Sequence, residues 1–129
     1  SRVNALAEEL ASAGVAFRLR TPTIVRPDER RTVDKWLALG TSVLSGHVGL
    51  ASELGRAGRD VVADYAVNCF NQHTAAELFR LGARRVTVSV ELTTDEIAQL
   101  VAPWDGDGFD AFVYGRPEGM TIEHCVLSA

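Results

Sequence analysis

The stretch of residues 61–92, VVADYAVNCFNQHTAAELFRLGARRVTVSVEL, decides the fold. Its first residues, 61–65, are rich in β-branched and aromatic side chains and predict a strand. The tetrapeptide TAAE at 74–77 has the spacing of a capping box, which predicts a helix start. Gly82 stands where a left-handed residue would end that helix, and residues 85–90 then alternate as a second strand. A strand, a helix and a strand of this length predict a parallel, right-handed βαβ unit.

The same rhythm extends to both sides of this unit. Helical patterns separate five predicted strands, at residues 15–20, 42–45, 61–65, 85–90 and 109–114. This alternation indicates an α/β protein with a parallel sheet, either an open doubly wound sheet or part of an eight-stranded barrel. No glycine-rich dinucleotide fingerprint follows the first strand, which disfavours a dinucleotide-binding sheet. Five units are too few to close a barrel of eight strands.

Composition and charge narrow the class of protein. A chain of 129 residues with 47% hydrophobic residues predicts a single domain with a substantial core, residues 1–129. The net charge of −4 gives no overall basic surface for nucleic acid. No apolar run approaches the roughly 20 residues of a membrane span, and no signal peptide is visible. Two cysteines make no disulfide framework, so we expect a cytoplasmic protein. The ending CVLSA, without a polar tail, suggests a piece of a longer chain.

Polar residues lie at or just beyond the ends of the third, fourth and fifth predicted strands, where α/β proteins gather their functional groups. They are Asp64, Asn68, Asn71, Ser89, Glu91, Tyr114 and Arg116. Because alternate residues of a strand share a face, each strand turns a partly polar set to one side and an apolar set to its helices. A sheet buried on both faces would have continuous valine, isoleucine and leucine instead. The pattern favours the polar mouth of a barrel.

Glu91 and Arg116 are the predicted catalytic residues. A carboxylate at a strand end needs a partner, and Arg116 ends the neighbouring predicted strand. We expect an ion pair in which Glu91 acts as acid or base and Arg116 anchors an anionic or amide-bearing substrate. The other five residues are predicted to bind substrate. The alternative roles are structural: an ion pair that only ties two strand ends, polar groups that cap turns, and Asn71 as a helix N-cap.

Cys125 lies beside His124 near the end of the sequence. Two ligands do not make a zinc site, which needs four. One interpretation makes Cys125 a ligand of an iron–sulfur cluster that later cysteines complete, and the other makes it a free thiol.

Three phrases of the sequence resemble the collagenase-like peptidase (U32) family. They are DY…N…N at 64–71, G-ARRVTVSVEL at 82–92 and VYGR…M…HC at 113–125, where the family has phrases like DY-LNV-N, G-RRVTLSPEL and V-GR-PLM---HC. The resemblance covers about residues 43–127, and residues 1–42 match only in βα rhythm. Val90 stands where the family usually has proline, and residues 118–119 replace a more apolar pair.

The resemblance implies the second half of a (βα)₈ barrel, an incomplete barrel that lacks its first three units. It also implies that Cys125 matches the first cysteine of a cluster-binding segment, with a 4Fe–4S cluster in the parent protein and none in this fragment. Members are named peptidases of unknown catalytic type, while others resemble oxygen-independent hydroxylases that act on tRNA, rRNA or quinone precursors. The sequence itself has no Ser–His–Asp set, no HExxH helix and no paired aspartates of protease type.

Three hypotheses follow: a peptidase fragment inactive alone, a fragment of an iron–sulfur hydroxylase, and a non-catalytic scaffold. The expected partners are the rest of the parent barrel, a peptide or RNA substrate in the parent, and a second copy of the chain. The homodimer is expected because an unclosed sheet leaves two open edges. No membrane partner is expected.

Overall fold

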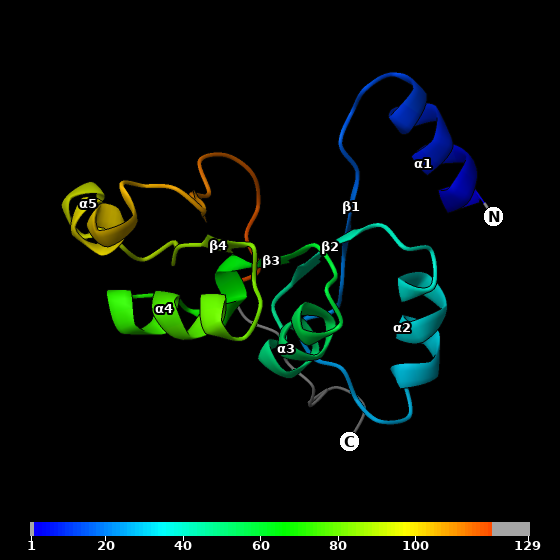
Figure 1. The fold of residues 1–129 in the computed structure, drawn as a ribbon, viewed down its shortest axis with the longest axis horizontal. Helices are drawn as coiled ribbons and strands as arrows, with labels where there is room; N and C mark the ends of the chain where they lie inside the picture. The colour runs from blue at the N-terminus through cyan, green and yellow to red at the C-terminus, as the bar shows by residue number, and fades with distance from the viewer. Residues whose placement is uncertain (1, 120–129) are drawn as a thin grey trace, which may run out of the picture.

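The computed structural model describes residues 2–119, which form a five-stranded sheet and the helices around it (Figure 1). The strands are β1 (Arg18–Arg20), β2 (Ser42–Ser45), β3 (Val61–Ala63), β4 (Arg85–Thr87) and β5 (Phe109–Asp110). The α-helices are α1 (Arg2–Ser12), α2 (Arg30–Leu37), α3 (Val48–Arg56), α4 (Gln72–Arg80) and α5 (Thr94–Val101). Two short 3₁₀ helices are η1 (Tyr65–Val67) and η2 (Ala102–Trp104).

The strand order decides between the two architectures that the sequence left open. The sheet runs β1-β2-β3-β4-β5, and every neighbouring pair is parallel. Each crossover therefore connects a strand to its next neighbour, always toward the same edge of the sheet. Right-handed crossovers of this kind place all their helices on one face. A doubly wound sheet would reverse its order at a switch point. The structure confirms an α/β fold of parallel βα repeats in the order of an incomplete, TIM-barrel-like half barrel.

The core lies between the sheet and its helices. One cluster of buried side chains joins β3 and β4 to α4 and α5, and a second joins β2 and β3 to α2 and α3. Figure 1 shows α3 and α4 together along one side of the strands. At their junction Gly55 meets the turn after α4 so closely that a Cβ would lie 2.7 Å from the Leu81 carbonyl oxygen. By contrast, α1 has no buried residue.

Four of the five strands are shorter than the alternating sequence predicted. β3 ends at Ala63 because Asp64 accepts a hydrogen bond from the Tyr65 amide, 2.8 Å, and starts η1. β4 ends at Thr87, where only an isolated bridge between Cys69 and Val88 continues the pairing. β5 comprises two residues and β1 three. Alternation continues in extended chain that no longer has a neighbouring strand, so it overestimates strand length. Only the prediction at 42–45 matches the observed bounds.

The predicted capping box at 74–77 was wrong. Helix α4 begins at Gln72, and its N-cap is Asn71, whose Oδ1 accepts the Thr74 amide at 2.9 Å. Glu77 instead accepts hydrogen bonds from Arg80. Within residues 2–119, no helix has the length and apolar character needed to cross a membrane.

Candidate functional site

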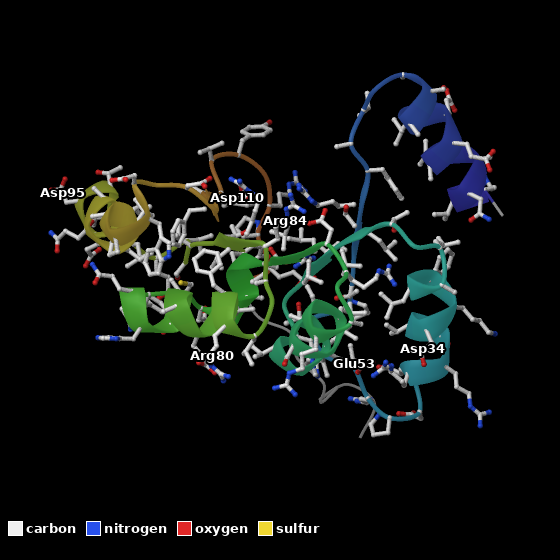
Figure 2. The ribbon with its side chains drawn as sticks, in the orientation of Figure 1. Asp34, Glu53, Arg80, Arg84, Asp95 and Asp110 are labelled. Carbon is white, nitrogen blue, oxygen red and sulfur yellow. The ribbon has the colours of Figure 1, made fainter. Side chains whose placement is uncertain are left out.

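The carboxyl ends of the strands surround a cavity of about 310 Å³. Its lining comes from the ends of the strands and the segment after β5: Arg20, Leu44, Asp64, Tyr65, Thr87, Ala111, Phe112 and Arg116. Arg20 and Leu44 are paired in the sheet, so their side chains lie on the same face. Val43 and Val61 are paired on the opposite face, where they pack against α2 and α3. In Figure 2, Asp110 at the end of β5 likewise lies on the opposite side of the sheet from Arg80 of α4. The polar face predicted from alternation is therefore the face away from α4.

Arg20 and Asp64 form the central ion pair of this face. Arg20 Nε donates to Asp64 Oδ2 at 2.8 Å, and Asp64 Oδ1 accepts the Tyr65 amide at 2.8 Å. Asp64 is buried, with 3% of its surface exposed, so a charge at this position requires such partners. The hydrogen bond to Asp64 raises the pKa of the Arg20 guanidinium. The pair joins the end of β1 to the end of β3 across β2.

Tyr65 connects this ion pair to the segment after β5. Its hydroxyl accepts the backbone N–H of Glu118 at 2.7 Å, and its ring meets Phe112 edge-on with centroids 5.7 Å apart. The Arg20 guanidinium carbon lies 5.7 Å from the centre of the same ring, within cation–π range. We call residues 111–118 the post-β5 segment. Tyr65 therefore holds this segment against the strand ends.

The predicted ion pair of Glu91 and Arg116 does not form within the part of the chain that the structure describes. Arg116 lines the cavity beside Arg20, whereas Glu91 lines a second cavity, also of about 310 Å³, with Asn68 and Glu118 among its other residues. The prediction failed because Glu91 lies four residues beyond the end of β4, in a turn where its amide donates to Ser89 Oγ at 3.3 Å. Tyr65 lines both cavities, so the two cavities are neighbours that share this residue.

The remaining predicted residues have the following positions. Asn71 is the N-cap of α4, the structural role that the sequence allowed. Ser89 is buried and accepts the Glu91 amide. Asn68 ends η1 in a left-handed conformation, φ 54°, and lines the Glu91 cavity. Tyr114 is 95% exposed. Cys125 lies outside the described residues.

Sequence reasoning missed Arg20, Tyr65 and Phe112 as site residues. Arg20 had a detectable signal, because the strand Arg18–Arg20 alternates arginine with leucine and ends at the expected functional edge. Tyr65 directly follows the predicted site residue Asp64. Phe112 had no signal, because its contact with Tyr65 depends on the path of the chain after β5.

Among residues 2–119, the hydroxyls of Ser42 and Thr93 donate to the carboxylates of Asp60 and Glu96, and none of these four residues lines either strand-end cavity. His47 is the N-cap of α3, and its Nδ1 accepts the Leu50 amide at 3.0 Å. Cys69 is fully buried, and burial raises the pKa of its thiol. The same residues contain no group of three or more His, Cys, Asp or Glu side chains placed to hold a metal ion. The described strand-end face thus carries groups suited to binding and orienting a ligand.

Comparison with known proteins identifies the fold. Neither a scan against protein-family models nor a search of curated proteins gave a match. Among solved structures, the chain is similar to the U32 peptidase Mk0906, with a TM-score of 0.61 and 17% sequence identity. The matched region covers 78% of this chain and 47% of that chain, so the chain spans about half the length of the solved protein. The comparison establishes that the chain has a U32-peptidase-like fold.

Proposed function

We propose that this chain is the five-stranded part of a U32-type peptidase barrel and contributes its substrate-binding face. The observation that carries the proposal is the convergence of Arg20, Asp64, Tyr65 and Arg116 on one cavity at the carboxyl ends of the strands. Barrel enzymes bind their substrates at this end. The similarity to a U32 peptidase over about half of that chain's length supports peptide as the substrate class.

The two neighbouring cavities suggest how a peptide would lie. Each has a volume of about 310 Å³, at the lower end of the range for ligand pockets. A peptide lying across Tyr65 would meet Arg116 on one side and Glu91 on the other. In this proposal Arg116 anchors the substrate, and Glu91 is the acid or base. Asp64 has both oxygens engaged by Arg20 and Tyr65, so its role is to position those two residues.

The proposal includes that the chain alone does not cleave peptides. The described face offers binding groups and the carboxylates of Asp64, Glu91 and Glu118. Cys69 is buried in the core and His47 is engaged as a helix cap. Cleavage would therefore need groups from the remainder of the barrel. That remainder is also the proposed partner that covers the open edges of β1 and β5.

A peptide-hydrolysis assay tests the proposal. The complete protein and this chain alone are incubated with a fluorescence-quenched peptide library, together with Glu91→Gln and a matched control, Glu8→Gln, on the exposed surface of α1. We expect cleavage by the complete protein and none by the chain alone. Glu91→Gln should lower kcat by about 10²–10⁴, the usual contribution of an acid or base, and Glu8→Gln should leave it unchanged. Full activity of Glu91→Gln would remove its catalytic role, and no cleavage by the complete protein would refute a peptidase.

A further inference from the structure

We infer that the Arg116 cavity accepts a terminal carboxylate with its neighbouring apolar side chain, as at the C-terminus of a peptide. The inference rests on the proposed function and specifies which part of the substrate enters this cavity. It follows from three properties of the lining: an arginine that pairs with no residue of the range 2–119, an apolar wall and a volume suited to a single amino-acid residue.

The charge belongs to Arg116. Arg20 is already engaged, with Asp64 at 2.8 Å and Glu118 at 3.5 Å. Asp110, at the end of β5, is engaged by Arg85 at 2.8 Å. Arg116 lines the cavity and has no ion pair or hydrogen bond with any residue of the described range 2–119. A guanidinium is a planar fork that binds a carboxylate through two parallel hydrogen bonds, so Arg116 is free to bind one from a ligand.

The apolar wall lies beside this charge. Leu44, Ala111 and Phe112 line the same cavity, and the Tyr65 ring packs edge-on against Phe112. Apolar lining with a few placed polar groups is typical of small-molecule and side-chain pockets. A volume of about 310 Å³ is at the lower limit for such pockets, which suits one residue better than an extended segment. The wall therefore favours a ligand that carries an apolar side chain next to its charge.

The same lining disfavours a phosphate group. Phosphate sites usually use the free amides at a helix N-terminus or several cations. None of the first residues of the described α-helices lines this cavity, and the first amide of η1 is taken by Asp64. The Asp64 carboxylate also lies in the lining, which opposes a dianion more than a singly charged carboxylate. A peptide carboxylate fits this balance of charge.

Binding of an acid and its neutral amide tests the inference. N-acetylphenylalanine and N-acetylphenylalanine amide are titrated into the ¹⁵N-labelled chain, and the amide-resonance shifts give affinity and location. We expect the acid to bind at least about ten-fold more tightly, because a charge-assisted pair is lost in the amide. Arg116→Gln should remove this preference. Arg56→Gln should keep the preference for the acid, because Arg56 is an exposed residue at the end of α3 that does not line the cavity.

The outcomes distinguish the inference from the proposed function. If acid and amide bind equally and both shift resonances around Asp64 and Phe112, the carboxylate inference is refuted while the substrate face stands. If neither compound shifts these resonances, or if the shifts cluster at the opposite ends of the strands near Gly58 and Gly82, both are refuted. Retention of the acid preference in Arg116→Gln would also refute the inference.

Discussion

Replacing Asp64 by asparagine would show how much the buried ion pair stabilises the strand-end face. Asparagine keeps the shape of the side chain, and its oxygen still accepts the Tyr65 amide. The substitution removes the charge and puts the side-chain NH2 group in the place of Oδ2, which accepts the Arg20 Nε–H at 2.8 Å. Its effect therefore isolates the ion pair from the cap of η1.

The structure sets the expected magnitude. Loss of one partner from a fully buried pair costs about 3–5 kcal/mol. The side chain of Asp64 is 5% exposed but that of Arg20 is 40% exposed, so Arg20 recovers part of its solvation in water. The expected loss in the free energy of unfolding is therefore that of a charge-assisted hydrogen bond, about 1.5–3 kcal/mol. With a typical urea dependence, this corresponds to a shift of the midpoint by about 1 M.

The second strand-end pair provides a matched control. Arg85 and Asp110 also form an Arg–Asp pair, with a shortest distance of 2.8 Å, but their side chains are 35% and 39% exposed. Asp110→Asn should therefore cost no more than about 1 kcal/mol. Urea unfolding followed by circular dichroism at pH 7, in low salt and in 1 M NaCl, measures both variants. Salt should reduce the smaller effect and leave most of the larger one. Equal losses for the two variants would refute the argument from burial.

Four further predictions concern packing, the thiols and assembly. Gly55→Ala should destabilise the chain by more than Gly58→Ala in thermal unfolding, because a Cβ at Gly55 meets backbone at 2.7 Å, whereas the left-handed Gly58 has open space; equal costs would contradict this. Burial raises the pKa of the Cys69 thiol above its ordinary 9.0, so the neutral thiol's contribution to stability is present below pH 9 and is lost as the pH rises through the folded-state pKa. At pH 8, iodoacetamide should modify Cys69 only as fast as the chain unfolds. Rapid labelling of the native chain, measured by mass spectrometry, would be the contrary result. Cys125→Ser should lower the iron content of the complete, anaerobically purified protein if Cys125 is a cluster ligand; unchanged iron removes it from the ligands. Light scattering should show self-association of this chain alone, because within residues 2–119 β1 and β5 each have a strand neighbour on one side only; a monomer at high concentration would argue against it.

The sequence predicted the fold better than the site. Local patterns suffice for βα repeats, because each strand and helix is defined by neighbours within a few residues. Residues 42–45, Ser-Val-Leu-Ser, matched because Gly40 and Gly46 limit this short segment on either side. The prediction at 109–114 extended too far, since Val113 continues the apolar run although the structure leaves it 91% exposed. Alternation does not show whether a neighbouring strand is present.

The site depended on contacts that no local pattern encodes. Asp64 was predicted from its place at the end of a strand, but its partner Arg20 lies 44 residues earlier in the chain. Glu91 was assigned to a strand end, yet the Ser89 turn takes it into a separate cavity. The direction of the chain after each strand determines which polar residues meet. Residue type and position alone therefore predicted polar groups at the carboxyl ends of the strands but paired Glu91 with the wrong neighbour.

Photo-crosslinking of a peptide to the complete protein tests the central claim most directly. A peptide that carries a benzophenone group is irradiated with the protein, and the adducts are located by mass spectrometry. The proposed substrate face predicts adducts at the carboxyl ends of the strands, on residues 64–68 and in the post-β5 segment around Phe112 and Arg116. Adducts confined to α3, α4 or the amino ends of the strands would contradict it.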